Sequence, residues 1–286
     1  MQTIQNSRYL IIHADDGGLC YSVNRAIMSA LEKGTVSSTS LMAPCPQLEE
    51  ITDYLKINPQ FDLGIHLTLT CEYPNYPWGP VSDKNNVKSL VNPAGYLWHS
   101  VKEFIQNAKP EDVETELRAQ VDCILEAGLQ PSHLDSHMGT VFMDLRFLEI
   151  YVKLGLEYQI TPMLVNPTEH GSELIDRFNF NIEKDVVERL MKSGIPFLNF
   201  LYMTDDSTKH LEEREKEYIN VINYLPSGVS QIIIHPGYDD EELKKITDNS
   251  SSRQYDFSIF INENIKNKID ELGVKLISWK DLAILT

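Results

Sequence analysis

The sequence predicts one α/β domain with a parallel sheet, either a closed (β/α) barrel or a doubly wound sheet. Strand-like apolar runs alternate with helix-like runs along the 286 residues. Polar residues directly follow several of these apolar runs, and in both architectures the carboxyl ends of the strands meet at one face. A chain of this length can bury the core of one large domain without dividing. A single domain over residues 1–286 is therefore expected.

The first third of the chain alternates regularly between strands and helices. Residues 8–14 form an apolar run that predicts the first strand. Residues 22–33 predict a helix, because their apolar members recur at helical spacing until Gly34 stops the pattern. The elements expected next are a strand at residues 37–42, a helix at 46–57 and a strand at 61–69.

The regular pattern breaks over residues 70–99. This segment is rich in proline and glycine and contains five aromatic residues, Tyr73, Tyr76, Trp78, Tyr96 and Trp98. A loop of this length inside a compact domain is usually a lid or a binding element. We expect residues 71–99 to form a lid over the site and to select the substrate.

The rest of the chain brings the total to about eight βα units, the number found in a closed barrel. A polar run at residues 248–252 predicts a loop. Helices are predicted at residues 110–128, 142–154, 183–192, 211–224 and 257–272, and strands at 132–135, 163–165, 197–201, 231–234 and 274–278.

Composition excludes several classes of partner. The chain has 25 Lys and Arg against 42 Asp and Glu, a formal net charge of −17, which disfavours nucleic acid and anionic membranes. It shows neither a secretory signal pattern nor an apolar run of about 18 residues, so a cytoplasmic protein is expected. The cysteines are too widely spaced for a disulfide framework or a zinc knot, and Cys71 is better read as a buried thiol than as a nucleophile.

Two carboxylates and three imidazoles are expected at the carboxyl edge of the sheet. Asp15 and Asp16 follow the first strand at a turn, which lets them point apart, one toward an ion and the other toward a substrate. His66, His137 and His235 also stand at the ends of predicted strands. Taken alone, the aspartate pair also fits an Asx turn, and each histidine also fits a hydrogen-bonded residue of the core. Together they suggest a metal-dependent hydrolase.

Asp16, His66 and His137 offer one oxygen and two nitrogens, an open ligand set with room for water and substrate. By ligand type this set suits Zn²⁺, Mn²⁺, Fe²⁺ or Co²⁺, and also Mg²⁺ if waters complete an octahedron. Strand alternation places Asp135 on the same face as His137, where its carboxylate can orient a ligating imidazole. His133 shares that face, but we interpret it as a core histidine.

The same residues resemble the YdjC-like carbohydrate deacetylases. The similarity begins with the His-Ala-Asp-Asp-Gly-Gly-Leu motif and continues, in order, through residues 23–27, 34–42, 64–70, 133–137 and 235–238. It implies an irregular (β/α) TIM-like barrel related to polysaccharide deacetylases. The implied activity is removal of acetyl groups from N-acetylated sugars such as chitooligosaccharides.

The resemblance also implies roles for individual residues. It assigns one divalent metal ion, Mg²⁺ or Zn²⁺, to the Asp16, His66 and His137 set, with Asp15 as base and His235 as acid. Two positions depart from the family pattern: Gly139 stands where a second histidine is usual, and Gly17 stands where an aromatic residue is usual. Both changes reshape the pocket. Residues expected to contact substrate are Tyr76, Trp78, Tyr238 and Arg253.

Two other functions fit parts of the pattern. One is a different metal-dependent barrel hydrolase or isomerase acting on a sugar derivative, which the lack of a glycine-rich phosphate loop disfavours. The other is a sugar-binding protein without turnover, which the missing second histidine favours and the retained Asp15, Asp16 and His235 disfavour. The expected partner is a small sugar or an oligosaccharide, and a homodimer is left open.

Overall fold

A computed structural model describes residues 7–166, 192, 194–204 and 210–285. Eight parallel strands form one sheet, in which β1 is central and pairs with β2, β7 and β8. The order along the sheet is β5-β4-β3-β2-β1-β7-β6, with β8 added beside β1. The strands are β1 (Arg8–Gly17), β2 (Ser38–Leu41), β3 (Leu63–Leu67), β4 (His133–Ser136), β5 (Thr161–Pro162), β6 (Phe200–Met203), β7 (Gly228–Ile234) and β8 (Lys275–Leu276).

The two ends of this path are joined by a short connection. Just beyond β5, Val165 forms a parallel bridge with Leu198, which lies just before β6. The Leu198 N–H donates to the Leu164 carbonyl at 2.8 Å, and the Asn166 N–H donates to the Leu198 carbonyl at 2.7 Å. The sheet therefore curls into an irregular barrel, which confirms the α/β barrel class.

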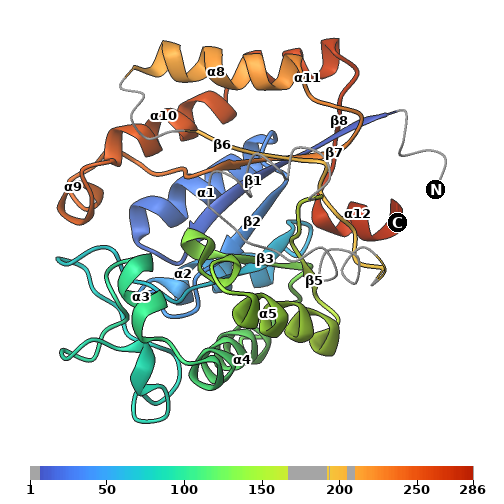
Figure 1. Ribbon diagram of the computed structural model, residues 1–286. Helices are drawn as coiled ribbons and strands as arrows, with labels where there is room; N and C mark the ends of the chain where they lie inside the picture. Colours follow the sequence, from blue (N-terminus) through green and yellow to red (C-terminus); the bar gives the residue numbers. More distant parts are fainter. Residues whose placement is uncertain (1–6, 167–191, 193, 205–209, 286) are drawn as a thin grey trace.

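Helices cover the outside of the sheet. In Figure 1, α8, α10 and α11 lie along one side, and α4 and α5 lie on the opposite side. Gly34 ends α1 in the left-handed conformation (φ 95°), as expected for a helix-stopping glycine. The helices are α1 (Tyr21–Lys33), α2 (Leu48–Ile57), α3 (Val101–Asn107), α4 (Pro110–Glu126), α5 (Leu145–Tyr158), α8 (Leu211–Asn223), α9 (Leu243–Ile246), α10 (Ser250–Phe260), α11 (Glu263–Glu271) and α12 (Trp279–Leu285), with 3₁₀ turns at η1 (Lys88–Leu90) and η2 (His137–Phe142).

Several element predictions need correction. The helix predicted at residues 257–272 is two helices, because Asn262 caps α11 by accepting a hydrogen bond from the Asn264 N–H. The polar run at residues 248–252 is not all loop: α10 begins at Ser250, whose hydroxyl donates to Asp239. Helices α3, α9 and α12 were not expected. The helix predicted at residues 183–192 lies, except for its last residue, outside the described residues.

A column of three aromatic rings runs along the barrel interior beneath the carboxyl edge. The indole of Trp279, at the start of α12, stacks on His133 with centroids 4.9 Å apart. His133 meets His13 edge to face, also at 4.9 Å. Gly64 leaves room for this column, because a Cβ there would lie 2.4 Å from the His133 ring. His133 is 1% exposed, which places it in the core as expected.

None of the helices within the described residues combines the length and the apolar character needed to cross a bilayer.

Candidate metal and catalytic site

A β-bulge at the end of β1 directs both aspartates of the pair toward the site. Asp15 and Asp16 lie inside β1 rather than in a turn, and the β1–β2 register shifts between Ala14 and Gly17. Asp16 has φ 69°, in the left-handed region, which breaks the alternation of a regular strand. Gly17 is required by close packing, since a Cβ there would lie 2.9 Å from the Ser40 carbonyl oxygen.

The three predicted metal ligands come together from three segments. Asp16 Oδ1 lies 3.5 Å from His66 Nε2 and 3.4 Å from His137 Nδ1. The two ring nitrogens are 3.2 Å apart. All three side chains are buried. A triangle with edges of this length suits an ion bonded to each atom at about 2.0–2.2 Å.

The chemistry of these atoms also fits a cation. Within the part of the chain that the structure describes, Asp16 Oδ1 is a buried oxygen that accepts no hydrogen bond. Burial would lower the pKa of His137, but the nearby carboxylates of Glu72 and Asp16 raise it to about 10. The carboxylates around His137 thus favour a positive charge between Asp16, His66 and His137. A divalent cation bound by these three residues would supply this charge. The donor set therefore fits the implied metal.

Each histidine of the triangle is oriented by a carboxylate on its other ring nitrogen. Asp135 Oδ1 lies 2.7 Å from His66 Nδ1, close enough for the orienting contact predicted for it. The Glu72 carboxylate lies 2.9 Å from His137 Nε2. Carboxylates in this position fix the tautomer and the ring orientation of metal-bound histidines. Sequence reasoning missed Glu72, which stands in the irregular segment just after β3.

Arg253 of α10, which was expected to contact substrate, lies within the site beside Asp16. Its Nη2 donates to Asp16 Oδ2 at 2.5 Å and to the Tyr73 hydroxyl at 3.3 Å. Burial opposes ionisation of Asp16, but the Arg253 guanidinium and the neighbouring histidines hold the pKa of this carboxyl well below its usual range. Arg253 is thus a buried ion-pair partner of Asp16. It fixes Asp16 as a carboxylate.

Asp15 faces two histidines across the site. Its Oδ2 is 3.8 Å from His66 Nε2 and 3.9 Å from Nε2 of His235, which follows β7 and is 25% exposed at its side chain. Its Oδ1 is 3.1 Å from His13 Nε2. His13 lies between Asp15 and Asp135, 2.9 Å from the latter. Burial would lower the pKa of His13, but the nearby carboxylates of Asp135 and Asp15 raise it to about 10.

A buried network fixes the backbone of His235. The His235 N–H donates to Asp256 Oδ2 at 2.9 Å. Asp256 is fully buried and also accepts from Arg214 Nε at 2.6 Å and from the Tyr218 hydroxyl at 2.7 Å. These residues lie on α8 and α10, where no motif marked them. Only the folded arrangement of the helices brings them to the end of β7.

The aromatic residues expected to bind sugar differ in exposure. Trp78 is 2% exposed, its indole N–H donates to the Thr70 carbonyl at 3.0 Å, and its ring meets His137 edge to face at 6.4 Å. Trp78, which was expected to contact substrate, is therefore a buried residue packed beneath the site. Tyr76 and Tyr238 are partly exposed.

Gly139, which stands where the family usually has a second histidine, has open space around it. Its φ is 62°, and a Cβ added there would meet no atom closer than 3.8 Å.

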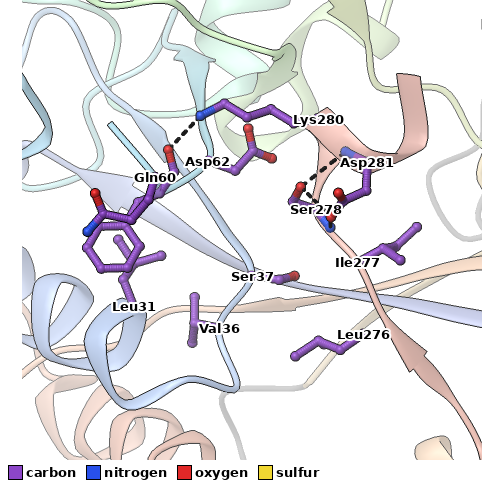
Figure 2. A pocket seen from close by; sticks show the side chains of 11 residues that line it. Leu31, Val36, Ser37, Gln60, Asp62, Leu276, Ile277, Ser278, Lys280 and Asp281 are labelled. Carbon is purple, nitrogen blue, oxygen red and sulfur yellow. Dashed lines mark hydrogen bonds between the residues drawn. The ribbon is translucent and has the colours of Figure 1, made fainter. Parts of the chain in front are cut away.

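A separate hollow of about 350 Å³ lies at the opposite end of the barrel (Figure 2). It is lined by residues that precede β2 and β3 and by residues from β8 to the start of α12, among them Ser37, Asp62 and Lys280. Asp62 Oδ2 accepts the Trp279 N–H at 2.7 Å, so this carboxylate helps to anchor α12. No predicted site residue lines this hollow.

The chain is similar to known proteins over nearly its full length. The carbohydrate deacetylase of Enterococcus faecalis is 27% identical over 98% of this chain and 100% of that protein. A carbohydrate deacetylase of Brevibacillus brevis is 29% identical over 96% of this chain and 99% of the relative. A crystal structure from Enterococcus faecalis, of a candidate cellobiose-phosphate cleavage protein, has a TM-score of 0.79 and 25% identity, covering 97% of this chain and 99% of that one.

A family model described as YdjC-like protein matches residues 9–271. The match extends from the start of β1 to the end of α11 and so contains each of the proposed ligands. The chain therefore belongs to the YdjC-like protein family.

Proposed function

We propose that this protein is a metal-dependent carbohydrate deacetylase that removes acetyl groups from N-acetylated sugars or oligosaccharides. The observation that carries the proposal is the triangle of Asp16, His66 and His137, with Asp15 and His235 beside it. The names of the full-length relatives support the same activity. An open ligand set next to a carboxylate and an imidazole is suited to amide hydrolysis.

In this proposal, the residues around Asp16, His66 and His137 have separate roles in the hydrolysis. A divalent ion bound there, Zn²⁺ or Mg²⁺ in our proposal, supplies Lewis-acid polarisation of the acetamide carbonyl and activation of water. Asp15 accepts the proton of the attacking water, and His13 holds its carboxylate in place. His235 donates a proton to the leaving amine nitrogen. Each positioned proton-transfer group of this kind contributes about 10²–10⁴-fold to the rate.

The segment at residues 71–99 is proposed to select the sugar. It supplies Glu72 beside His137 and Tyr73 beside Arg253, so it forms one wall of the site. Tyr76 lies on the same segment, and Tyr238 follows the His235 motif. Both are partly exposed and are proposed to contact the substrate.

The test combines metal analysis with acetate release from a panel of N-acetylated sugars. His66→Ala and His137→Ala each remove a ligand and should sharply lower both metal content and activity. Asp15→Asn should retain the metal and the fold but lose activity, because an amide does not accept the water proton. Full metal content in both histidine variants, or an active Asp15→Asn protein, would contradict these assignments.

A further inference from the structure

Glu72 holds one of the two ligand histidines through the nitrogen that points away from the triangle. Its carboxylate oxygens are 2.9 and 3.0 Å from His137 Nε2. The other ring nitrogen, Nδ1, faces Asp16 Oδ1 at 3.4 Å. When Nε2 carries the proton and donates it to Glu72, the lone pair of Nδ1 is directed into the triangle.

The two histidines are held in different ways. His66 presents Nε2 to the triangle and is fixed at Nδ1 by Asp135, whose side chain is 4% exposed on β4 within the barrel. His137 presents Nδ1 and is fixed at Nε2 by Glu72, whose side chain is 24% exposed and belongs to the irregular segment. One ligand is therefore oriented by the barrel and the other by the segment.

The chain around Glu72 is held firmly enough to fix the position of its carboxylate. The Cys71 N–H donates to the Trp98 carbonyl at 2.8 Å, and His99 Nδ1 lies 2.9 Å from the Cys71 carbonyl oxygen. On the other side, the Tyr73 hydroxyl accepts from Arg253. Trp78 packs against both Tyr73 and His137. The hydrogen-bonded neighbours thus place Glu72 beside the imidazole.

We propose that Glu72 is a positioning residue that selects the metal-binding tautomer of His137. Through Glu72, the affinity of the site for metal depends on the packing of residues 71–99. This inference rests on the metal site of the proposed function. Loss of an orienting partner of this kind typically weakens metal binding about 10–100-fold.

The test measures the dissociation constants of Zn²⁺ and Co²⁺ by chelator competition, and the visible absorption of the Co²⁺ protein. Glu72→Ala and Glu72→Met both remove the acceptor and should raise the dissociation constants by about 10–100-fold and alter the Co²⁺ bands. Glu72→Gln keeps an acceptor oxygen and should recover most of the affinity. Asp83→Asn, an exposed carboxylate on the same segment, removes the same charge and should leave both readouts unchanged.

The outcomes separate this inference from the proposed function. Wild-type affinity and an unchanged Co²⁺ spectrum in either folded acceptor-free variant would overturn the role of Glu72 while leaving the metal site intact. Equal weakening by Asp83→Asn would also overturn it, because the effect would then come from charge alone. If His66→Ala bound metal as tightly as the wild type, the site itself would be wrong.

Discussion

Asp16 adopts a backbone conformation that is rare for a residue with a side chain. Its φ of 69° lies in the left-handed region, where such strain costs on the order of 1–3 kcal/mol and is found mainly at functional sites. In a regular strand, Asp15 and Asp16 would point to opposite faces. The bulge instead places Asp16 beside His66 and His137, the proposed metal ligands, while Asp15 lies beside His13 and His235. The strain thus brings two adjacent carboxylates into one site.

His13 should make stability depend on pH. Its folded-state pKa of about 10 lies above the ordinary value of 6.5. The protonated ring therefore contributes stability that is fully present below about pH 6.5 and is lost as the pH rises through about 10. His13→Gln removes this contribution. Denaturant unfolding at a series of pH values should show a steeper fall between pH 7 and 10 for the wild type than for the variant, and parallel curves would contradict the charge assigned to His13.

At the residue scale, the sequence was informative where a polar side chain follows an apolar run. Asp16, His66 and His137 could be proposed because the ends of parallel strands converge whatever the details of the fold. Glu72 and Asp256 could not, because one lies in an irregular segment and the other on a helix. Their roles depend on which loop and which helix pack against the strand ends. The spacing of apolar residues along the sequence does not indicate this packing.

At the scale of elements, several apolar side chains of residues 71–99 are buried in the hydrophobic core. Trp78, Val87, Leu90 and Leu97 are at most 2% exposed. Two buried carboxylate oxygens of Glu116, on α4, accept the N–H groups of Val81 and Ser82 at 2.9 Å. A count of prolines and aromatic residues predicts a shaped loop, but does not tell which rings turn inward. That is why Trp78 was expected to contact substrate.

Trp78→Ala should therefore destabilise the fold. Removing a buried aromatic side chain typically costs about 3–5 kcal/mol, because it leaves a cavity. Tyr96→Ala, at a residue of the same segment that is 39% exposed, should cost much less. Chemical denaturation of both variants measures the difference. A Trp78→Ala protein of wild-type stability but with reduced kcat/KM would instead support a direct contact between Trp78 and the substrate.

At the scale of the whole molecule, the barrel is irregular, as the family resemblance implied, and its strand count alone suggested a more regular ring. Counting about eight strand–helix units predicted a closed ring. In the structure, β8 sits beside β1 over only two residue pairs, and one bridge at Val165 and Leu198 joins the ends of the seven-strand path. Apolar patterning identifies strands but not their partners, so the class of fold was predictable and the pairing was not.

Metal binding should stabilise the entire domain. An ion that binds only the folded state adds about 2.7 kcal/mol at a free concentration of 100 times its dissociation constant. In a chain of this size that should raise the melting temperature by several degrees. Thermal unfolding with Zn²⁺ and after treatment with a chelator measures the shift. The shift should vanish in His66→Ala, and an equal shift in that variant would show that the ion binds elsewhere.

The ring column inside the barrel links the two ends of the molecule mechanically. Trp279 belongs to the last described helix, yet only His133 separates it from His13, which touches both Asp15 and Asp135. Such a stack transmits displacement because close-packed rings have no free volume to absorb it. Helix α12 therefore supports the candidate site from below, and a change in how α12 packs at the base of the barrel is expected to shift Asp15, the proposed base.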